Sequence, residues 1–438
     1  MPATTPPSTP PAKALSARAP DAPAMPATPS APGAAGRIVA LDVLRGVAIL
    51  GTLASNIWIF TTPGGPAEWI SDGFASSDPV QRVLLALVNG KFLGLLTLLF
   101  GVGLELQYRS MVRRGLPWPG RYALRAGILF LEGLLHYILV FEFDVLMGYA
   151  IASLLAAYLI GRSDRVVRAW GGVLAATYVA GIVSVTALLV LSSVAQDTDA
   201  AGGGAPTDTA ASSTAALSTA SWLDQVLLRI THLDVFRIEL ILIVPSATVL
   251  FLVGSRLVRA GMFSTGGARL RRRLAWAGLG AGLPLNALTT WAGPDWFLVD
   301  RYLVPPLVAL GILALGTTLV DRAQTRAQTR AQARAQHGVQ AGAQAPAPRR
   351  SPAGLLRRGV EAVGRTALSC YVLQNVLASA LCYDWGLGLA GGGGPWQAVA
   401  IWAGISLALM VVAPLWLRRW PRGPIELLMH RVYDARRR

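Results

Sequence analysis

The residues best suited to chemistry lie together in one apolar stretch, residues 132–149, EGLLHYILVFEFDVLMGY. Glu132 and His136 are four residues apart, so they share one face if the segment is helical. A carboxylate so placed orients a histidine and makes it more basic, which suits a general base at neutral pH. Glu142 and Asp144 follow at a very short predicted hairpin. The same pattern fits a buried, hydrogen-bonded histidine, and spacing leaves both interpretations open.

Two further groups of ionisable residues lie in or beside apolar segments. Lys91 lies inside NGKFLGLLTLLFGVGLEL, where it either snorkels outwards or meets a carboxylate of residues 132–149. Asp42 and Arg45 are three residues apart in RIVALDVLRGVAILG and can pair on one helix face. That pair is also typical of a simple topology anchor. Gly46 beside it permits close approach of another helix.

The elements that position these residues are apolar helices. The chain has 438 residues, 53% hydrophobic and 14% charged, whereas soluble domains usually carry about 25% charged residues. Repeated apolar runs of about 20 residues predict an all-α, polytopic transmembrane helical bundle. The ten expected spans are residues 38–60, 83–107, 123–141, 144–160, 169–194, 236–258, 274–292, 302–320, 364–383 and 396–416.

The distribution of arginine predicts the orientation of the spans. Arginines gather in alternate connections: residues 109–125, 162–168, 256–273, 321–365 and 418–438. Positive loops stay in the cytoplasm, so both termini are expected there. The net charge of +16 is therefore explained by membrane topology, and we expect the lipid bilayer rather than nucleic acid as partner.

Composition divides the chain into four regions. These are a disordered, Pro/Ala-rich cytoplasmic tail at 1–36, a membrane domain of about eight spans at 37–320, a low-complexity basic linker at 321–354, and a C-terminal membrane pair with an amphipathic tail at 355–433. The first apolar run follows proline-rich sequence rather than a basic start, so we expect a retained span and not a cleaved leader.

The ninth predicted span contains VGRTALSCYVLQNVL, with Ser369, Tyr371, Gln374 and Asn375. Hydrogen bonding between helices is the expected role of such polar residues in a membrane. The closing segment WLRRWPRGPIELLMHRVYD ends the last span with arginine and tryptophan. Its continuation is a proline-broken amphipathic segment, which we expect on the inner leaflet.

Several other chemistries lack support in the sequence. His136 is the one histidine well inside a predicted span, so no metal site is expected. Cys370 and Cys382 are twelve residues apart in one span, too far for a disulfide. Phosphate-binding, dinucleotide-binding and serine-hydrolase motifs are missing from the sequence. ATP-driven pumping and classical serine hydrolysis are therefore not predicted, and no bound cofactor is expected.

Several of these segments together resemble a known family. They are LDVLRGVAILG, KFLGLLTLLFGVGL, the histidine-to-aspartate stretch, VGRTALSCYVLQ and WLRRWPRGPIELL. They resemble the YeiB-like family of bacterial inner-membrane proteins, which carries the domain of unknown function numbered 418. The resemblance runs in the family's order from residue 37 to residue 433 and implies a multi-pass protein of the bacterial plasma membrane. Phe143 stands where that family usually has glycine, and Cys370 where asparagine is common.

The opening LDxLRG motif is also similar to that of membrane acyltransferases, including the heparan glucosaminide N-acetyltransferase group. In those groups acyl-CoA donates from the cytoplasm, and an intramembrane histidine serves an acceptor on the other side. Asn56 stands where the acyltransferase-3 group has a histidine. By that similarity His136 is the base. The acyltransferase hypothesis adds an orienting carboxylate, a lysine that stabilises developing negative charge, and a donor site on the basic side. The catalytic candidates are His136, Glu132, Asp144 and Lys91, and the donor-binding candidates are Asp42, Arg45 and Arg121.

Two functions from different classes follow. The first is an integral-membrane acyltransferase that moves an acyl group from a cytoplasmic thioester, with acyl-CoA as co-substrate, to an envelope glycan or lipid acceptor. The alternative is a permease or proton-coupled exporter of a small molecule, because intramembrane carboxylates and histidines also build proton relays. A non-catalytic membrane protein or sensor is a third class. The sequence shows no clear internal repeat of the kind common in transporters, and it predicts no oligomeric state.

Overall fold

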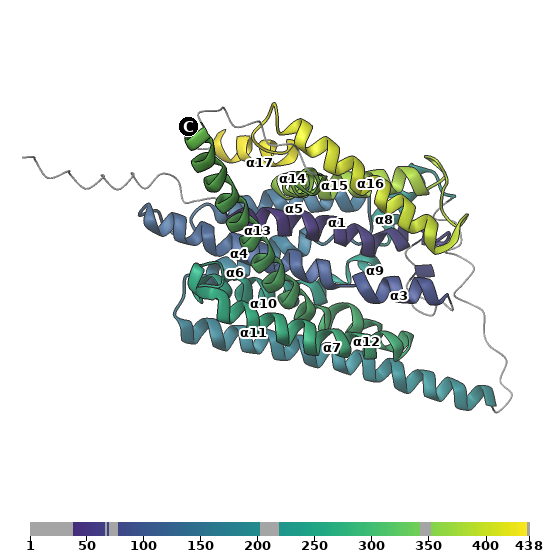
Figure 1. Cartoon of the computed structure of the whole chain (residues 1–438). Coiled ribbons are helices and arrows are strands. Elements are labelled where there is room, and N and C mark those ends of the chain that lie inside the picture. Colours follow the sequence, from purple (N-terminus) through teal and green to yellow (C-terminus); the bar gives the residue numbers. More distant parts are fainter. Residues whose placement is uncertain (1–37, 66–67, 70–77, 202–218, 342–351, 436–438) are drawn as a thin grey trace, which may run out of the picture. The chain divides into compact units, whose positions relative to one another are not determined.

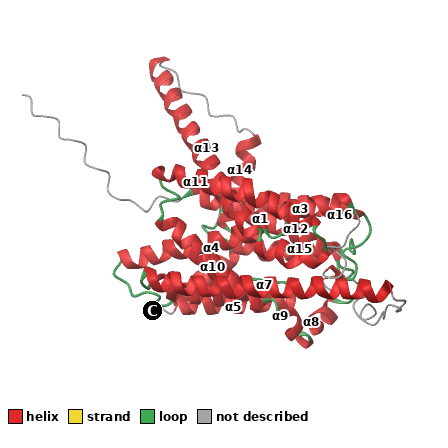
Figure 2. Ribbon diagram, turned by 90° about the horizontal axis from the view of Figure 1, so that it is seen from below, coloured by secondary structure: helices red, strands yellow, loops and turns green. Residues whose placement is uncertain are grey.

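The computed structural model describes residues 38–65, 68–69, 78–201, 219–341 and 352–435. Every regular element in these ranges is a helix, as Figure 2 shows. The predicted all-α class is therefore confirmed. Residues 39–438 form one unit, and the predicted tail at residues 1–36 lies outside the described residues.

The N-terminal half of the unit contains α1 (Val39–Thr61), α3 (Pro79–Val88), α4 (Lys91–Arg113), α5 (Tyr122–Leu139), α6 (Leu146–Ile160), α7 (Asp164–Ala201), α8 (Trp222–Thr231) and α9 (Leu233–Arg237). The C-terminal half contains α10 (Leu240–Arg259), η1 (Thr265–Gly267), α11 (Ala268–Ala275), η2 (Trp276–Ala281), α12 (Gly282–Trp291), η3 (Pro294–Trp296), η4 (Val299–Leu303), α13 (Pro305–Ala341), α14 (Pro352–Arg365), α15 (Ala367–Cys382), α16 (Gly394–Trp416) and α17 (Pro424–Ala435). The elements η2 and η4 are π-helical.

Within the described residues, seven helical segments are long and apolar enough to cross a membrane. They are Val39–Thr61, Pro79–Arg113, Tyr122–Leu139, Asp164–Ala195, Leu240–Arg259, Pro294–Ala333 and Gly394–Trp416. The helices α6 and α15 are apolar but shorter. The seventh expected span, 274–292, is divided among the end of α11, η2 and α12. The protein is thus a helical membrane protein, while the count of ten spans and the cytoplasmic termini stay predictions.

The helix α1 forms the centre of the unit, and α7 lies along its edge (Figure 1). In the apolar 18-residue section of α1, 72% of the section is buried inside the protein, whereas only 17% of the corresponding section of α7 is buried. Two glycines let α1 cross α14 at close range. A side chain on Gly46 would collide with the Val360 carbonyl, and one on Gly364 with the Asp42 carbonyl. Small residues in these positions let helix backbones meet, so the predicted role of Gly46 is confirmed.

The hairpin between α5 and α6 holds Asp144 in a fixed position. Its Oδ2 accepts hydrogen bonds from the backbone N–H groups of Leu146 (2.9 Å) and Met147 (3.4 Å), so the side chain caps α6. Phe141 in the same hairpin stacks on Phe60 of α1, with ring centroids 4.7 Å apart. The hairpin is therefore anchored by its own cap and by an aromatic contact with the central helix.

Part of the predicted linker is helical. Residues 321–341 continue α13 beyond its apolar section, and this end of the helix extends past its neighbours in Figure 2. Arg322, Arg326 and Arg330 are exposed there. The remainder of the linker, residues 342–351, lies outside the described residues.

Candidate functional site

The geometry of the site starts from His136 and Asp144. His136 Nδ1 lies 2.9 Å from Asp144 Oδ1, and the two residues are only 3% and 0% exposed. Because the carboxylate accepts, the proton belongs on Nδ1, which leaves Nε2 as the basic ring nitrogen. The cap on α6 fixes the carboxylate in turn. The pair has the same geometry as the Asp–His half of a catalytic triad, in which the acid sets the tautomer and orientation of the base.

The helix α15 adds two side chains to this pair. The Asn375 amide nitrogen lies 3.2 Å from His136 Nε2, and the Tyr371 hydroxyl donates to Asp144 Oδ1 over a long 3.5 Å. The Tyr371 ring also lies against the imidazole, with centroids 5.4 Å apart. Tyr371 and Asn375 thus make the expected hydrogen bonds to another helix, whereas both polar atoms of Gln374 are buried without a partner among the described residues. We call His136, Asp144, Tyr371 and Asn375 the His136 cluster.

Glu132 does not orient His136, contrary to the sequence hypothesis. Both of its carboxylate oxygens are buried and lack a hydrogen-bond partner within the described residues. The carboxylate that contacts the imidazole is that of Asp144, at Nδ1. A spacing of four places two side chains on one helix face but does not fix their rotamers. The charged groups that act on Glu132 are instead the carboxylates of Glu426 and Asp144.

Lys91 belongs to a different polar region. Its ammonium is 2% exposed and donates to the Ala86 carbonyl at 2.6 Å, and the charge that acts on it is that of Asp300. Asp300 accepts hydrogen bonds from Asn89 and Asn286, each at 2.8 Å. No hydrogen bond of Lys91 in the described part of the chain reaches the His136 cluster.

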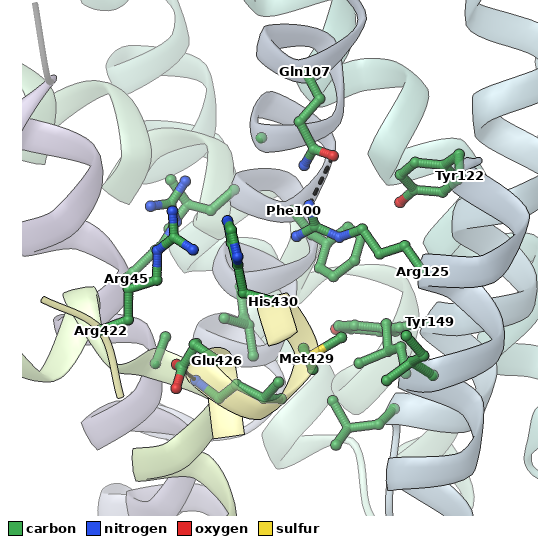
Figure 3. Close-up of a pocket in the computed structure, with 18 of the residues that line it drawn as sticks. Arg45, Phe100, Gln107, Tyr122, Arg125, Tyr149, Arg422, Glu426, Met429 and His430 are labelled. Atoms are coloured by element: carbon green, nitrogen blue, oxygen red, sulfur yellow. Dashed lines mark hydrogen bonds between the residues drawn. The ribbon is translucent and has the colours of Figure 1, made fainter. Parts of the chain in front are cut away.

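A cavity of about 750 Å³ opens beside α1, α4, α5, α15 and α17. We call it the donor cavity. Its mouth is basic. Five arginines and one histidine line it on the Arg-rich side of the bundle: Arg45, Arg114, Arg125, Arg365, Arg422 and His430. In Figure 3, Arg45, Arg422 and His430 lie close together, and Arg125 donates to Gln107 at 2.9 Å. Glu426 is the one carboxylate among the described lining residues.

The lining of the donor cavity also includes apolar side chains and one member of the His136 cluster. The apolar residues include Leu99, Phe100, Leu129 and Leu146, and the member of the cluster is Tyr371. The Tyr371 hydroxyl is one hydrogen bond from Asp144 and two from His136. The imidazole does not itself line the cavity. The Tyr371 ring therefore stands between the cavity and the base.

The donor-binding candidates lie at different distances from this cavity. Arg45 lines it, and Asp42 forms an ion pair with Arg45 at 3.1 Å. Arg121 is exposed at the start of α5 and does not line the cavity, whereas Arg125, one turn later, does. Two of the three candidates thus contribute to the mouth, one directly and one through its partner.

The helix α17 completes the mouth. Glu426 accepts a hydrogen bond from the Leu368 backbone N–H at 2.9 Å and one from the Ser369 hydroxyl, so it caps the N-terminus of α15. Met429 and His430 then reach the cavity from the same helix. The amphipathic segment expected on the inner leaflet therefore packs on α15 and α5.

Sequence reasoning missed two arginines that fix the hairpin. Arg229 forms an ion pair with Glu142 at 2.8 Å, and both are almost fully buried. Arg237 donates to the carbonyls of Glu142 and Asp144 (3.0 Å to the latter), and its guanidinium lies 4.0 Å from the centre of the Tyr137 ring. A usable signal existed in α8, where buried Gln225 and Arg229 share one face of an otherwise apolar helix.

Comparison with known proteins agrees with the motif resemblance. Residues 346–436, which include α14–α17, match the family described as protein of unknown function (DUF418). The chain is 35% identical over 124 residues to the uncharacterized protein YeiB of Escherichia coli (strain K12), covering 27% of this chain and 30% of YeiB. It is 30% identical over 122 residues to the uncharacterized protein YxaH of Bacillus subtilis (strain 168), covering 26% of this chain and 30% of YxaH.

The matched region spans about 30% of the length of these two relatives. No solved structure matches the chain significantly. The family match covers the helix that supplies Tyr371 and Asn375 and the helix that supplies Glu426. The C-terminal region of this chain is thus similar to the DUF418 family and to YeiB and YxaH, in agreement with the motif resemblance.

Proposed function

We propose that this protein is an integral-membrane acyltransferase of the bacterial plasma membrane. It would move an acyl group from a cytoplasmic thioester to a hydroxyl or amine of an envelope glycan or lipid. The observation that carries the proposal is the donor cavity, which joins a basic mouth to the His136 cluster through an apolar wall. A thioester donor needs those three environments in that order.

The mouth suits a phosphorylated donor such as acyl-CoA. Arginine guanidinium groups bind phosphate oxygens through paired, charge-assisted hydrogen bonds. Five arginines line the cavity against one carboxylate, Glu426, which already accepts hydrogen bonds from α15. The cavity volume of about 750 Å³ is within the usual range for small-molecule sites. The phosphates would stay at the mouth while the thioester reaches the apolar end.

The His136 cluster can supply the proton transfers of the reaction. His136 Nε2 takes the proton of the acceptor hydroxyl or amine while the acceptor atom attacks the thioester carbonyl carbon. The carbon–sulfur bond then breaks, and the same proton passes from Nε2 to the leaving sulfur. Asp144 holds Nδ1–H and stabilises the imidazolium between the two steps. For this sequence to occur, the Tyr371 ring must leave its position between cavity and base.

The test is transfer of label from acetyl-CoA. Purified protein in lipid is incubated with labelled acetyl-CoA and a bacterial membrane extract, beside His136→Ala and His232→Ala. His232 is exposed and provides the matched control. We expect acetylated product from wild type and His232→Ala and none from His136→Ala, with acetyl-CoA binding in all three. Absence of both binding and transfer in wild type would refute the proposal.

One observation favours the permease or exporter as a second candidate. Buried ionisable groups lie outside the His136 cluster as well, among them Lys91, Asp300 and the Glu142–Arg229 pair, and such groups mark ion pathways in membranes. Uptake or release of labelled solutes by sealed vesicles measures this function. Solute flux that requires His136, in protein that does not bind acetyl-CoA, would favour it over acyl transfer.

A further inference from the structure

A second, much smaller cavity lies on the other side of Tyr371. We call it the outer cavity; its polar lining residues are Thr52, Ser55, Asn56, Glu239, Arg301 and Tyr371. Its volume is about 10 Å³, about the space of one water molecule. Tyr371 lines both cavities. Tyr371 is the one described residue that the two linings have in common.

The two cavities lie toward opposite ends of the helices that they share. In α1, Arg45 near the first turn lines the donor cavity, and Asn56 near the last turns lines the outer cavity. In α4, Gln107 lines the donor cavity, while Gly90 just before the first turn lines the outer one. The cavities are thus arranged one after the other along the helix axes, with Tyr371 between them.

The chemistry of the two cavities differs as clearly as their position. The donor cavity has an apolar wall, whereas the outer cavity collects hydroxyl, amide, carboxylate and guanidinium groups. Glu239 Oε1 accepts a hydrogen bond from the Tyr302 hydroxyl, and Oε2 is buried without a partner among the described residues. A buried acceptor of this kind favours a ligand that brings a hydrogen-bond donor.

We infer that the outer cavity receives the nucleophilic hydroxyl or amino group of the acceptor, and that the Tyr371 ring is a movable partition between this group and the thioester. The partition rests on the proposed acyl transfer. Only one functional group fits the cavity at a time, so the body of the acceptor stays outside it. The hydroxyl of Tyr371 donates to Asp144 over a long 3.5 Å and accepts from the Val145 backbone N–H, and these two hydrogen bonds hold the ring in its present position. When the ring turns, His136 meets both substrates.

Hydroxylamine is a suitable probe because it is a nucleophile small enough for the outer cavity. Its nitrogen attacks the carbonyl carbon of acetyl-CoA, the carbon–sulfur bond breaks, and a proton passes from nitrogen through His136 to sulfur. The products are acetohydroxamate and free CoA, which are both measured directly.

The first variant fills the outer cavity. We expect Ser55→Leu to raise the KM for hydroxylamine about tenfold or more, because added methylenes occupy the space of the nucleophile. The dissociation constant of acetyl-CoA stays unchanged. Ser406→Leu is the matched control, since Ser406 is a buried serine of α16 outside both cavities. The inference would be overturned if Ser55→Leu changed the KM for hydroxylamine and the dissociation constant of acetyl-CoA equally, or if it changed neither.

The second pair of variants tests the partition itself. Tyr371→Ala opens the wall and admits water, so we expect thioester hydrolysis to acetate and CoA to rise about tenfold relative to hydroxamate formation. Tyr371→Phe keeps the ring and loses only the hydroxyl. Its ratio of thioester hydrolysis to hydroxamate formation should therefore stay near that of wild type. Equal ratios in the two variants would overturn the partition alone. Wild type that neither binds acetyl-CoA nor forms hydroxamate would overturn the proposed acyl transfer together with it.

Discussion

The two ends of the candidate site are built differently. At the hairpin, Arg229 and Glu142 are 1% and 0% exposed, and Arg237 holds the backbone on both sides of Phe143. At the mouth of the donor cavity, Arg365, Arg422 and His430 are exposed. Buried groups held by ion pairs and hydrogen bonds fix geometry, whereas exposed arginines can contact an anionic ligand that arrives from solvent. For the proposed acyl transfer, this difference suggests that the hairpin positions the base and that the mouth binds the donor.

The largest expected effect concerns the positioning end. Asp144→Asn keeps an oxygen that can cap α6 but removes the negative charge that sets the tautomer of His136. By analogy with triad aspartates, we expect transfer to fall about 10³–10⁴-fold. Acetyl-CoA binding at the mouth should be unchanged, as measured by equilibrium binding of labelled acetyl-CoA.

Asp384→Asn is the control for that variant, because Asp384 is exposed. Its transfer rate should match wild type. Full activity of Asp144→Asn would contradict the proposed difference between the two ends of the site, because the hairpin would then have no role in positioning His136.

The next largest effect is on stability. Arg229→Ala leaves the Glu142 carboxylate buried without its cation, which usually costs about 3–5 kcal/mol. Arg45→Ala, which removes a partly exposed partner of Asp42, should cost about 1 kcal/mol or less. Thermal unfolding in detergent, with equal protein and lipid content, measures the difference.

A double variant separates charge burial from shape in the same region. Arg229→Met with Glu142→Leu replaces both charges by apolar groups of similar volume, and such replacements are often neutral or stabilising. We expect a Tm near that of wild type. If the double variant unfolds as early as Arg229→Ala, the packing around the pair rather than the unpaired charge controls stability.

The sequence predicted the helical class and the region of the site because both depend on local patterns. Apolar runs indicate spans wherever they occur. Gly46 indicated a close crossing with another helix, and that helix is α14. His136 and Asp144 were recognised because ionisable residues are rare in such runs. Phe143 replaces the family's usual glycine, yet Asp144 still caps α6 and holds His136.

The partners of these residues could not be predicted, because they come from distant segments. Asn375 is 239 residues from His136, and Arg229 is 87 residues from Glu142. No spacing rule connects such positions. Lys91 was expected near the base because it occupies the corresponding depth of its span, but the side chain turns to Ala86 and Asp300. Depth in the membrane does not specify which helix lies next to which.

Removal of a positive charge from the mouth of the donor cavity should lower the affinity for acetyl-CoA moderately. Arg422→Gln removes one exposed cation of the mouth, and we expect acetyl-CoA to bind about tenfold more weakly, as one charge-assisted phosphate contact is lost. The loss should shrink at high salt, because exposed charges are screened. Transfer at saturating acetyl-CoA should be unchanged.

Arg431→Gln, one residue from His430 but not in the cavity lining, is the matched control for Arg422→Gln. Its affinity for acetyl-CoA should equal that of wild type. Equal losses in both variants would mean that the mouth attracts the donor by general charge and not by contact.

The smallest expected effect decides between the two carboxylates near the base. Glu132→Gln preserves shape, and Glu132 makes no hydrogen bond to His136, so transfer should change by less than about threefold. A carboxylate that oriented the base would instead cost about a hundredfold or more when replaced by its amide. The rate of hydroxamate formation at saturating substrates distinguishes the two outcomes. A hundredfold loss would return the orienting role to Glu132 and move the positioning end of the site from the hairpin to the shared face of α5.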